Sequence, residues 1–324
     1  MFTLRIDGRE IAPRPDETVL DALLRAGVEA PHSCRAGACR ACLVRATAGA
    51  PPEDATDGVP PPLRERGWFL ACLARPASDL TLTYEDDGEA SVAADVRSVE
   101  LLAPDVARLA LRPRGTFSYR PGQYVVLRRE DGLSRPYSLA SVPDEDDDLE
   151  LHVRRVPGGA FSGFVFDDLR AGDRLDLRGP FGSCVYPEAP TDEALLLAGT
   201  GTGLAPLLGV LREALRRGHA GPIDLYHGGR TADDLYLDER LARLVGGRDG
   251  VRYVPAPLGG APVRGGPVGP LDEVVFERHA DLTGHRVFLC GAPDLVQKMR
   301  KQAFLRGAEL DAIHADPFLS APPR

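Results

Sequence analysis

The sequence predicts three domains of different fold classes: a small α+β domain over residues 1–90, an antiparallel β-barrel over 91–190 and a doubly wound parallel α/β domain over 191–324. Three observations support this division. Four cysteines are concentrated in the first segment, short alternating strands separated by turns fill the second, and strands alternate with helices in the third. At 324 residues the chain is long enough for each domain to bury its own core.

The composition is that of an ordinary globular protein, with 43% apolar and 27% charged residues. No apolar run approaches the ~18 residues that a membrane span requires, so we expect no membrane partner. The net charge of −9 argues against a nucleic-acid-binding surface. Arg5 and Asp7 place charges too early for a signal peptide, so a cytoplasmic location is expected.

The first segment opens with a predicted β-hairpin around an Asp-Gly turn, followed by a short helix. The helix is expected over Asp16–Ala26 because apolar residues recur on one face, with Asp16 or Thr18 as its N-cap and Gly27 at its end. The other expected elements are strands at Phe2–Ile6, Arg9–Ala12, Leu43–Ala46, Trp68–Leu73 and Leu80–Tyr84, a proline-rich loop at Pro51–Pro62 and an acidic linker at 85–89.

The four cysteines follow the spacing C-x4-C-x2-C, with the fourth after a longer interval. This is the ligand pattern of a plant-type [2Fe–2S] cluster. Small residues around Gly37 let the backbone approach the inorganic sulfides, and glycine tolerates the positive φ of such a wrap. Structural zinc sites use paired C-x2-C units and disulfides require an oxidising compartment, so both alternatives fit less well. The predicted metal ligands are Cys34, Cys39, Cys42 and Cys72.

The middle segment has many short alternating strands with turn signals between them, which predicts an antiparallel barrel. The acidic run 144–148 is expected to be a solvated hairpin tip. The expected strands are Ala94–Leu102, Val106–Leu111, Gln123–Arg128, Tyr137–Ala140, Leu149–Val153 and Arg174–Leu177, with a helix at Phe161–Leu169.

Two motifs in this segment are candidates for ligand binding. Arg135–Ser138, with the sequence R-P-Y-S, offers an arginine for a phosphate, an aromatic ring for a flat ligand and a hydroxyl for a ring heteroatom. An ordinary strand with an exposed arginine explains the same residues, so both interpretations remain open. Gly158–Ser162 opens a helix and offers either a second anion site or a simple glycine turn.

From Ala194 the alternation of strand and helix predicts a parallel, doubly wound sheet. The turn Gly199–Gly203, with the sequence G-T-G-T-G, follows the first strand, where glycines let a pyrophosphate reach backbone amides. Packing alone also produces such turns. The expected strands are Ala194–Ala198, Ile223–Tyr226, Val251–Pro255 and Arg286–Leu289, and the expected helices are Leu204–Arg217, Asp234–Val245 and Pro293–Arg306.

Two cysteines outside the four-cysteine motif remain. Cys290 lies at the carboxyl end of a late strand, where ligands of such sheets bind, although a buried structural cysteine is the alternative. Cys184 is expected to be structural, because nothing near it in the sequence suggests an activated thiol.

Together these motifs resemble the NAD(P)H-dependent reductase components of bacterial oxygenases, in which a plant-type ferredoxin domain is fused to a ferredoxin–NADP⁺-reductase-like module. Benzoate and naphthalene dioxygenase reductases and methane monooxygenase reductase have this domain order. The resemblance implies a β-grasp ferredoxin domain, a Greek-key FAD barrel and a doubly wound NAD(P) domain. It rests on the four cysteines, on Arg135–Ser138 matching R-x-Y-S, and on Gly179–Gly182, Gly199–Pro206 and Cys290–Pro293.

The resemblance implies roles for individual residues around FAD. Arg135 would hold the FAD phosphates, Tyr137 would pack on the flavin or its ribityl chain, and Ser138 would sit near flavin N5. Gly159 and Ser162 would complete the pyrophosphate site. The further cofactor contacts predicted in the barrel are Pro136, His152, Val153 and Ala160.

The nicotinamide cofactor is assigned to the last domain in the same way. Cys290 would sit beside the nicotinamide, and Phe318 in the C-terminal tail would cover the flavin face. Ser138, Cys290 and Phe318 are therefore the predicted catalytic residues. The further predicted contacts are Gly199, Thr200, Gly201, Thr202, Gly203, Arg230 and Gly291.

The chain departs from the family pattern at one position and leaves the nucleotide preference open. The family usually has Gly, Ala, Ser or Thr directly after the second cysteine, where this chain has Arg40. Its side chain can point to solvent; two hypotheses are that it raises the cluster potential or marks a docking surface. Arg230 can clamp a 2′-phosphate, whereas Asp233 and Asp234 would repel one, so we favour NADH with NADPH as an alternative.

The resemblance predicts an electron-transfer reductase. NAD(P)H gives hydride to FAD, and single electrons pass through the cluster to a separate terminal oxygenase of the Rieske or di-iron type. One alternative is a reductase for an iron–sulfur dehydratase in deoxysugar biosynthesis, and another is a redox-sensing module without turnover. A monomer with no nucleic-acid or membrane partner is expected.

Overall fold

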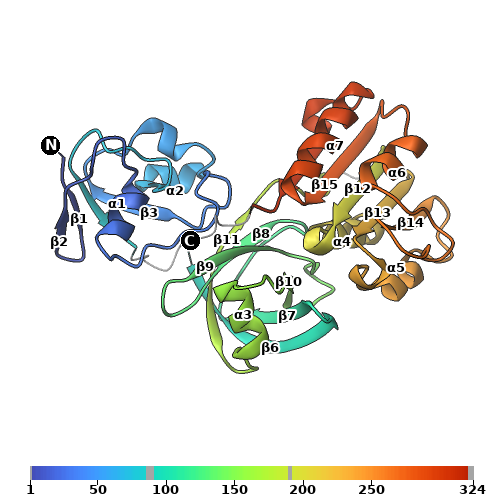
Figure 1. Cartoon of the computed structure of the whole chain (residues 1–324), viewed down its shortest axis with the longest axis horizontal. Helices are drawn as coiled ribbons and strands as arrows, with labels where there is room; N and C mark the ends of the chain where they lie inside the picture. The colour runs from blue at the N-terminus through green and yellow to red at the C-terminus, as the bar shows by residue number, and fades with distance from the viewer. Residues whose placement is uncertain (1, 85–90, 189–191, 320–324) are drawn as a thin grey trace.

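The computed structural model describes residues 2–84, 91–188 and 192–319, which form three domains, each built on its own sheet (Figure 1). The barrel lies between the other two domains in Figure 1. The domain boundaries predicted at residues 90 and 190, and the acidic linker predicted at 85–89, lie outside the described residues. Within the described ranges, no helix is long and apolar enough to cross a membrane.

The first domain is a mixed five-stranded sheet with the order β2-β1-β5-β3-β4. Strand β1 pairs with β5 in parallel and with β2 in an antiparallel hairpin, which confirms the β-grasp arrangement. The strands are β1 (Leu4–Ile6), β2 (Arg9–Ile11), β3 (Leu43–Ala48), β4 (Trp68–Leu70) and β5 (Leu80–Thr83).

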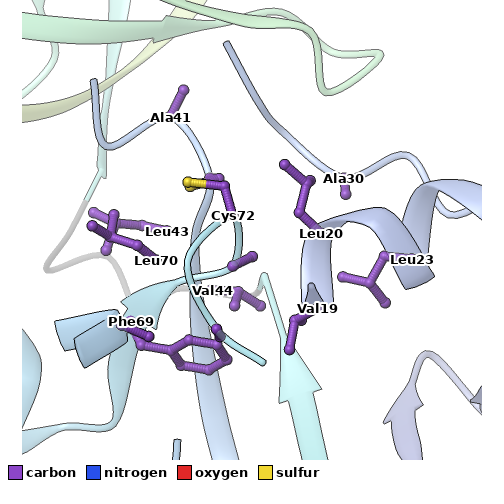
Figure 2. Close-up of a cluster of buried hydrophobic side chains, with 14 of the residues drawn as sticks. Val19, Leu20, Leu23, Ala30, Ala41, Leu43, Val44, Phe69, Leu70 and Cys72 are labelled. Atoms are coloured by element: carbon purple, nitrogen blue, oxygen red, sulfur yellow. The ribbon is translucent and has the colours of Figure 1, made fainter. Parts of the chain in front are cut away.

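Helix α1 (Val19–Arg25) covers this sheet with its apolar face, and Val19, Leu20 and Leu23 point into the core shown in Figure 2. Its N-cap is Thr18, whose side chain accepts a hydrogen bond from the backbone N–H of Asp21 at 3.1 Å. The choice between Asp16 and Thr18 is thereby settled.

Two expectations for this domain were wrong. Strand β4 ends at Leu70, and Cys72 lies in a turn closed by a hydrogen bond from the backbone N–H of Leu73 to the carbonyl of Leu70. The turn brings the Cys72 thiol to the edge of the core (Figure 2). The proline-rich loop also contains one short helix, η1 (Glu53–Thr56), and a second, α2 (Pro61–Glu65), begins at its end, because proline is compatible with the first turn of a helix.

The second domain is a six-stranded antiparallel sheet with the order β10-β7-β6-β11-β8-β9. A bridge between Leu139 and Leu151 joins its two edges, so the sheet closes into the predicted barrel. The elements are β6 (Ser91–Ala103), β7 (Val106–Pro113), β8 (Tyr124–Arg128), β9 (Ser134–Ser138), β10 (Leu149–Arg154), α3 (Ala160–Asp167) and β11 (Arg174–Phe181).

Two details of the barrel differ from expectation. The strand expected at Tyr137–Ala140 begins earlier, at Ser134, because Ser134 to Ser138 pair with all of β8. The acidic run 144–148 is not merely a solvated tip. Asp146 binds Arg212 of the third domain at 2.7 Å, and the side chain of Arg212 is only 12% exposed. The run therefore helps to join two domains.

The third domain is a five-stranded sheet with the order β14-β13-β12-β15-β16, in which every pair is parallel. Its strands are β12 (Ala194–Thr200), β13 (Ile223–Gly229), β14 (Val251–Pro257), β15 (His285–Gly291) and β16 (Ile313–Pro317). Helices α4 (Leu204–Arg216) and α5 (Asp238–Val245) cover one core, and α6 (Leu271–Arg278) and α7 (Pro293–Leu305) cover the other. The sheet is therefore doubly wound.

Helix α6 and strand β16 were not predicted, and α5 begins later than expected. Leu237 has a φ of +62°, which interrupts the helix expected from Asp234, so a short 3₁₀ turn (Ala232–Asp234) precedes α5. Strand β16 extends the sheet beside β15 and directs the tail from Asp316 onward towards the barrel.

Candidate functional site

The first three cysteines of the motif lie in an irregular loop, and all four are buried, with exposed fractions of 9% for Cys34, 8% for Cys39, 3% for Cys42 and 7% for Cys72. The backbone N–H groups of Ala36 and Cys39 donate to the sulfur of Cys34 at 3.3 and 3.4 Å. Small residues thus allow backbone amides to face sulfur, as a cluster loop requires.

The four thiols form two pairs. A hydrogen bond joins Cys34 to Cys39 and lowers the pKa of Cys34, and a second joins Cys42 to Cys72 and lowers the pKa of Cys72. Within the described ranges, no three His, Cys, Asp or Glu side chains are placed to hold one metal ion together. Two pairs of cysteine sulfurs fit a centre with two irons, as a [2Fe–2S] cluster requires.

A cavity of about 1570 Å³ is bounded by all three domains. Ala38 and Cys39 of the cysteine loop form part of its wall, and Thr202 of the third domain forms another part. From the barrel, the cavity is lined by Arg135, Pro136, Tyr137, Ser138, His152, Gly159, Ala160 and Ser162. Its size and mixed lining suit a ligand as large as a dinucleotide.

The R-P-Y-S motif occupies strand β9 and faces this cavity. The Tyr137 ring lies 5.6 Å from the Phe161 ring, centroid to centroid, and burial raises the pKa of its hydroxyl. The Arg135 guanidinium donates to the carbonyl of His32 in the first domain at 2.9 Å. Arg135 is therefore partly buried between two domains rather than freely exposed.

The start of helix α3 forms a glycine cradle beside this strand. Ser162 Oγ accepts from the backbone N–H of Val156 at 3.0 Å and donates to the carbonyl of Gly159 at 3.2 Å. A Cβ at Gly159 would lie 2.6 Å from Ser162 Oγ, so a larger residue would displace the serine. The cradle leaves room for a pyrophosphate at the helix N-terminus.

The glycine turn after β12 serves two purposes. A Cβ at Gly199 would lie 2.7 Å from Leu207, and one at Gly203 would lie 2.4 Å from the carbonyl oxygen of Cys290, so these glycines permit close packing. Gly201 has a φ of +54°, and Thr202 faces the cavity. Thr200 Oγ1 accepts from the backbone N–H of Ala292 at 3.3 Å, which ties the turn to the end of β15.

Cys290 and Cys184 are neighbours. Their sulfur atoms are 3.5 Å apart, and burial raises the pKa of the Cys290 thiol. Cys184 lines the cavity, whereas Cys290 lies just behind it, at the end of β15. Gly291 follows with a φ of +120°, and its carbonyl accepts from the backbone N–H of Phe318 at 2.8 Å. Phe318 lines the same cavity.

Asp316 is a site residue that sequence reasoning missed. Ser138 Oγ lies 3.3 Å from Asp316 Oδ2, and removal from water raises the pKa of this carboxyl to about 6. The only signal in the sequence was its place two residues before Phe318.

Three other predicted contacts have distinct environments. His152 lines the cavity, and its ring nitrogens contact Glu150 and the hydroxyl of Tyr236, both at 3.0 Å. The Val153 side chain belongs to the barrel core instead, so a side-chain contact with a ligand in the cavity is not supported. Arg230 lies near the end of β13, and its guanidinium pairs with Asp234 at 3.3 Å.

Family models match all three domains. A 2Fe-2S iron-sulfur cluster binding domain matches residues 2–77, an oxidoreductase FAD-binding domain matches 93–186 and an oxidoreductase NAD-binding domain matches 197–301. The cofactors implied by these matches are a [2Fe–2S] cluster, FAD and a nicotinamide dinucleotide.

Characterised relatives match nearly the whole chain. The reductase subunit of an Amycolatopsis aromatic O-demethylase is 38% identical over 99% of both chains. The ferredoxin–NAD(P)(+) reductase component of the Pseudomonas putida naphthalene 1,2-dioxygenase system is 32% identical over 93% of both chains. The ferredoxin–NAD(+) reductase component of the Xanthobacter autotrophicus alkene monooxygenase system is 35% identical over 96% of both.

Solved structures agree with these matches. An Amycolatopsis cytochrome P450 reductase superposes with a TM-score of 0.70 at 36% identity, covering 98% of this chain and 99% of that one. A ferredoxin reductase of carbazole 1,9a-dioxygenase gives a TM-score of 0.66 at 26% identity, covering 98% of both chains.

Proposed function

The chain belongs to the family of ferredoxin–NAD(P)⁺ reductase components of bacterial oxygenase systems, and from that premise we propose that its electron acceptor is a separate terminal oxygenase. The chain itself is an oxidoreductase with FAD- and NAD-binding domains and an N-terminal [2Fe–2S] domain. One observation carries the proposal most directly: a single cavity is bounded by Cys39, by the Arg135–Ser138 motif and by Phe318.

In this proposal the barrel residues position FAD, which when bound supplies the conversion between hydride transfer and single-electron transfer. Arg135 offers its guanidinium to phosphate oxygens, and Tyr137 gives a flat wall for the flavin or its ribityl chain. Gly159, Ala160 and Ser162 present the N-terminus of α3 to the pyrophosphate. Pro136 and the backbone of His152 and Val153 complete the predicted contacts.

Other residues act at the reacting end of the cavity. Ser138 is proposed to orient the flavin ring, while its Oγ and the Asp316 carboxyl hold a proton between them. Cys290 and Gly291, at the end of β15 and just behind the cavity wall, would lie beside the nicotinamide. Phe318, which lines the same cavity, would cover the flavin face when no nicotinamide is bound. The turn Gly199–Gly203 holds the dinucleotide phosphates through its backbone amides.

NADH is the proposed nucleotide. Asp234 Oδ2 accepts hydrogen bonds from the backbone N–H of Arg230 at 3.0 Å and of Thr231 at 3.1 Å, so a fixed carboxylate stands beside Arg230. Such a carboxylate disfavours a 2′-phosphate and suits a ribose hydroxyl. Kinetics with NADH and NADPH would test this choice, and a higher kcat/KM for NADPH would overturn it.

Cys34, Cys39, Cys42 and Cys72 are the proposed cluster ligands. Replacing Cys42 or Cys72 by serine should abolish the cluster absorbance and leave the flavin bands, whereas Cys184→Ser should retain both. Retention of a normal [2Fe–2S] spectrum in Cys42→Ser would exclude that ligand.

The acceptor class is tested with purified oxygenases. Rieske and di-iron oxygenases are the acceptors expected from the sequence. Two Amycolatopsis matches, a reductase subunit of an O-demethylase and a cytochrome P450 reductase, make a cytochrome P450 a third candidate acceptor. Anaerobic mixing with NADH should reduce the flavin, then the cluster, then the cognate oxygenase. A cluster that stays oxidised would refute this order.

The alternatives give different results. Reduction of an iron–sulfur dehydratase but of no oxygenase would favour deoxysugar biosynthesis, and failure to reduce cytochrome c or ferricyanide rapidly would favour a redox sensor. A monomer in the cytoplasm, where cysteines stay reduced and can bind the cluster, is also part of the proposal. Size-exclusion chromatography with light scattering tests the monomer.

A further inference from the structure

Arg40 does not point freely into solvent. It follows Cys39 in the cluster loop and has a φ of +55°, a region that residues other than glycine rarely adopt. Its Nε donates to the carbonyl of Gly58 at 2.7 Å, and its Nη1 donates to the hydroxyl of Tyr124 at 2.9 Å. Arg40 therefore connects two parts of the first domain with strand β8 of the barrel.

The Tyr124 hydroxyl also binds the cluster loop at a second residue, Ala38. It donates to the carbonyl of Ala38 at 3.0 Å while accepting from Arg40. The hydroxyl thus fixes the loop on both sides of Cys39. Both of its hydrogen bonds cross from the barrel to the first domain, in a residue that is only 9% exposed.

Aromatic packing holds the tyrosine in place. The rings of Tyr124 and Phe181 are 5.7 Å apart, and the Arg40 guanidinium carbon lies 5.2 Å from the Phe181 centroid. A Cβ at Gly182 would lie 3.1 Å from the Tyr124 ring, so the turn after β11 also fits closely around it. The arrangement is a built contact rather than a surface arginine near a tyrosine.

The Arg40–Tyr124 contact lies between the predicted cluster site and the predicted flavin site. Ala38, Cys39, Arg40 and Tyr124 all line the cavity that Tyr137 and Ser138 line from the other side. Movement of the loop would change the distance between the cluster ligand Cys39 and anything bound against Tyr137.

We propose that Arg40 and Tyr124 form an interdomain clasp that fixes the cluster-binding loop relative to the flavin site, so that both are positioning residues for electron transfer from flavin to cluster. This inference rests on the proposed function. A transfer between two centres depends on their separation and orientation, so a fixed loop keeps the molecule in the competent geometry. Loss of the clasp lowers the fraction of molecules in that geometry.

Charge-conserving variants separate this role from an effect of charge on the cluster. Tyr124→Phe keeps the ring and removes the hydroxyl. Arg40→Lys keeps the positive charge, but its one nitrogen cannot occupy the positions of both Nε and Nη1. Arg35→Lys is the matched control, because Arg35 lies in the same loop with a φ of +56° but binds Asp21 of helix α1 instead of the barrel.

The holoproteins are mixed anaerobically with NADH while the flavin and cluster absorbances are followed separately. In Tyr124→Phe and Arg40→Lys, we expect flavin bleaching at the wild-type rate and cluster bleaching slower by about tenfold. The cluster midpoint potential should match wild type, because no net charge changes. The double variant should be no slower than the slower single variant, since the two residues act as one unit.

Amide hydrogen exchange supplies a readout without turnover. The backbone amides of residues 38–42 in the oxidised holoprotein should exchange faster in both variants and at the wild-type rate in Arg35→Lys. The clasp is refuted if cluster bleaching and loop exchange stay at wild-type values in both variants. A shifted potential with unchanged exchange would also refute it, in favour of a charge effect.

Different experimental results would refute the proposed function and the clasp. If NADH reduces the flavin of the wild type but never its cluster, the proposed function is wrong, and hydrogen exchange alone decides whether the clasp exists. If the wild type completes the relay and both variants match it, only the clasp is wrong.

Discussion

The first and third domains pack on the same barrel by different means. On the side of the first domain, arginines donate to uncharged oxygens: Arg135 to the carbonyl of His32, and Arg178 to the carbonyl of Leu43 at 3.1 Å. On the side of the third domain, Arg212 forms ion pairs with the acidic run 144–148. There, Gly209 of α4 also approaches the backbone of the barrel closely.

The difference indicates which perturbation each contact can tolerate. An arginine bound to a carbonyl depends on direction and burial, so salt affects it little. An ion pair near the surface loses strength as salt screens the charges. A close backbone approach depends on the absence of a side chain, so it fails when a single methyl group is added.

The largest expected effect is at the close backbone approach. A Cβ at Gly209 would lie 2.9 Å from the Leu139 carbonyl oxygen and 3.0 Å from the Gly122 nitrogen. Gly209→Ala should therefore lower the free energy of unfolding by about 3 kcal/mol, measured by chemical denaturation. Gly163→Ala is the control in helix α3, where the nearest atom to an added Cβ is a side-chain oxygen of Asp167 at 4.0 Å. This change should stabilise the protein by about 0.5–1 kcal/mol. Equal effects of the two changes would contradict the steric explanation.

The contact on the other side of the barrel is tested at Arg178. Its guanidinium lies 4.9 Å from the Trp68 ring centroid and also binds Leu43, so Arg178→Ala should cost about 2 kcal/mol of unfolding free energy. Arg174→Ala, at the exposed start of the same strand, should cost less than ~0.5 kcal/mol. A neutral result for Arg178→Ala would mean that this arginine does not anchor the first domain.

Asp316 makes the third domain's contact with the barrel pH-dependent. Burial raises the pKa of the Asp316 carboxyl from its ordinary value of 3.8 to about 6 in the folded protein. The contribution of this residue to stability is therefore fully present below about pH 4 and is lost as the pH rises through 6. Relative to Asp316→Asn, the wild type should lose about 1–2 kcal/mol over this range. Parallel stability curves from pH 4 to pH 7 would contradict this.

The smallest effect is the response to salt. Arg212→Ala should lower the free energy of unfolding, and raising the ionic strength from about 0.05 M to about 1 M should make this loss smaller by roughly 0.5 kcal/mol. The free-energy cost of Arg178→Ala should change less with salt, because the Leu43 carbonyl and the Trp68 ring that Arg178 contacts are both neutral. The comparison uses unfolding free energies at both salt concentrations, and equal salt dependence of the two costs would remove the proposed distinction between the interfaces.

Local patterns explain why much of the fold was predictable. The alternating strands of the barrel and the apolar strands of the third domain have periods that the sequence displays directly. Helix α6 was missed because its segment Leu271–Arg278 shows no capping side chain and follows a loop rich in glycine and proline. Strand β16 was missed because Ile313–Pro317 is short and mixed in character, and it is a strand only through pairing with β15.

The candidate site shows the same division. Three of the four cysteines lie in one short stretch and R-P-Y-S in another, so residue type and spacing reveal both motifs. Val153 was predicted as a contact, but its side chain faces the barrel core, because neighbouring strand residues point to opposite faces. Asp316 was missed, because a lone aspartate carries no signal until the chain brings it to Ser138.

Residues close together in the chain are enough to predict the three fold classes, the spacing of the cysteine ligands and the order of the binding motifs. Three contacts between distant residues follow instead from the way the domains pack. Ser138 meets Asp316 across 178 positions, Cys184 meets Cys290 across 106 and Arg40 meets Tyr124 across 84. Each joins residues from different strands or domains, and which side chains meet there is set by how the three domains pack, which no local periodicity encodes.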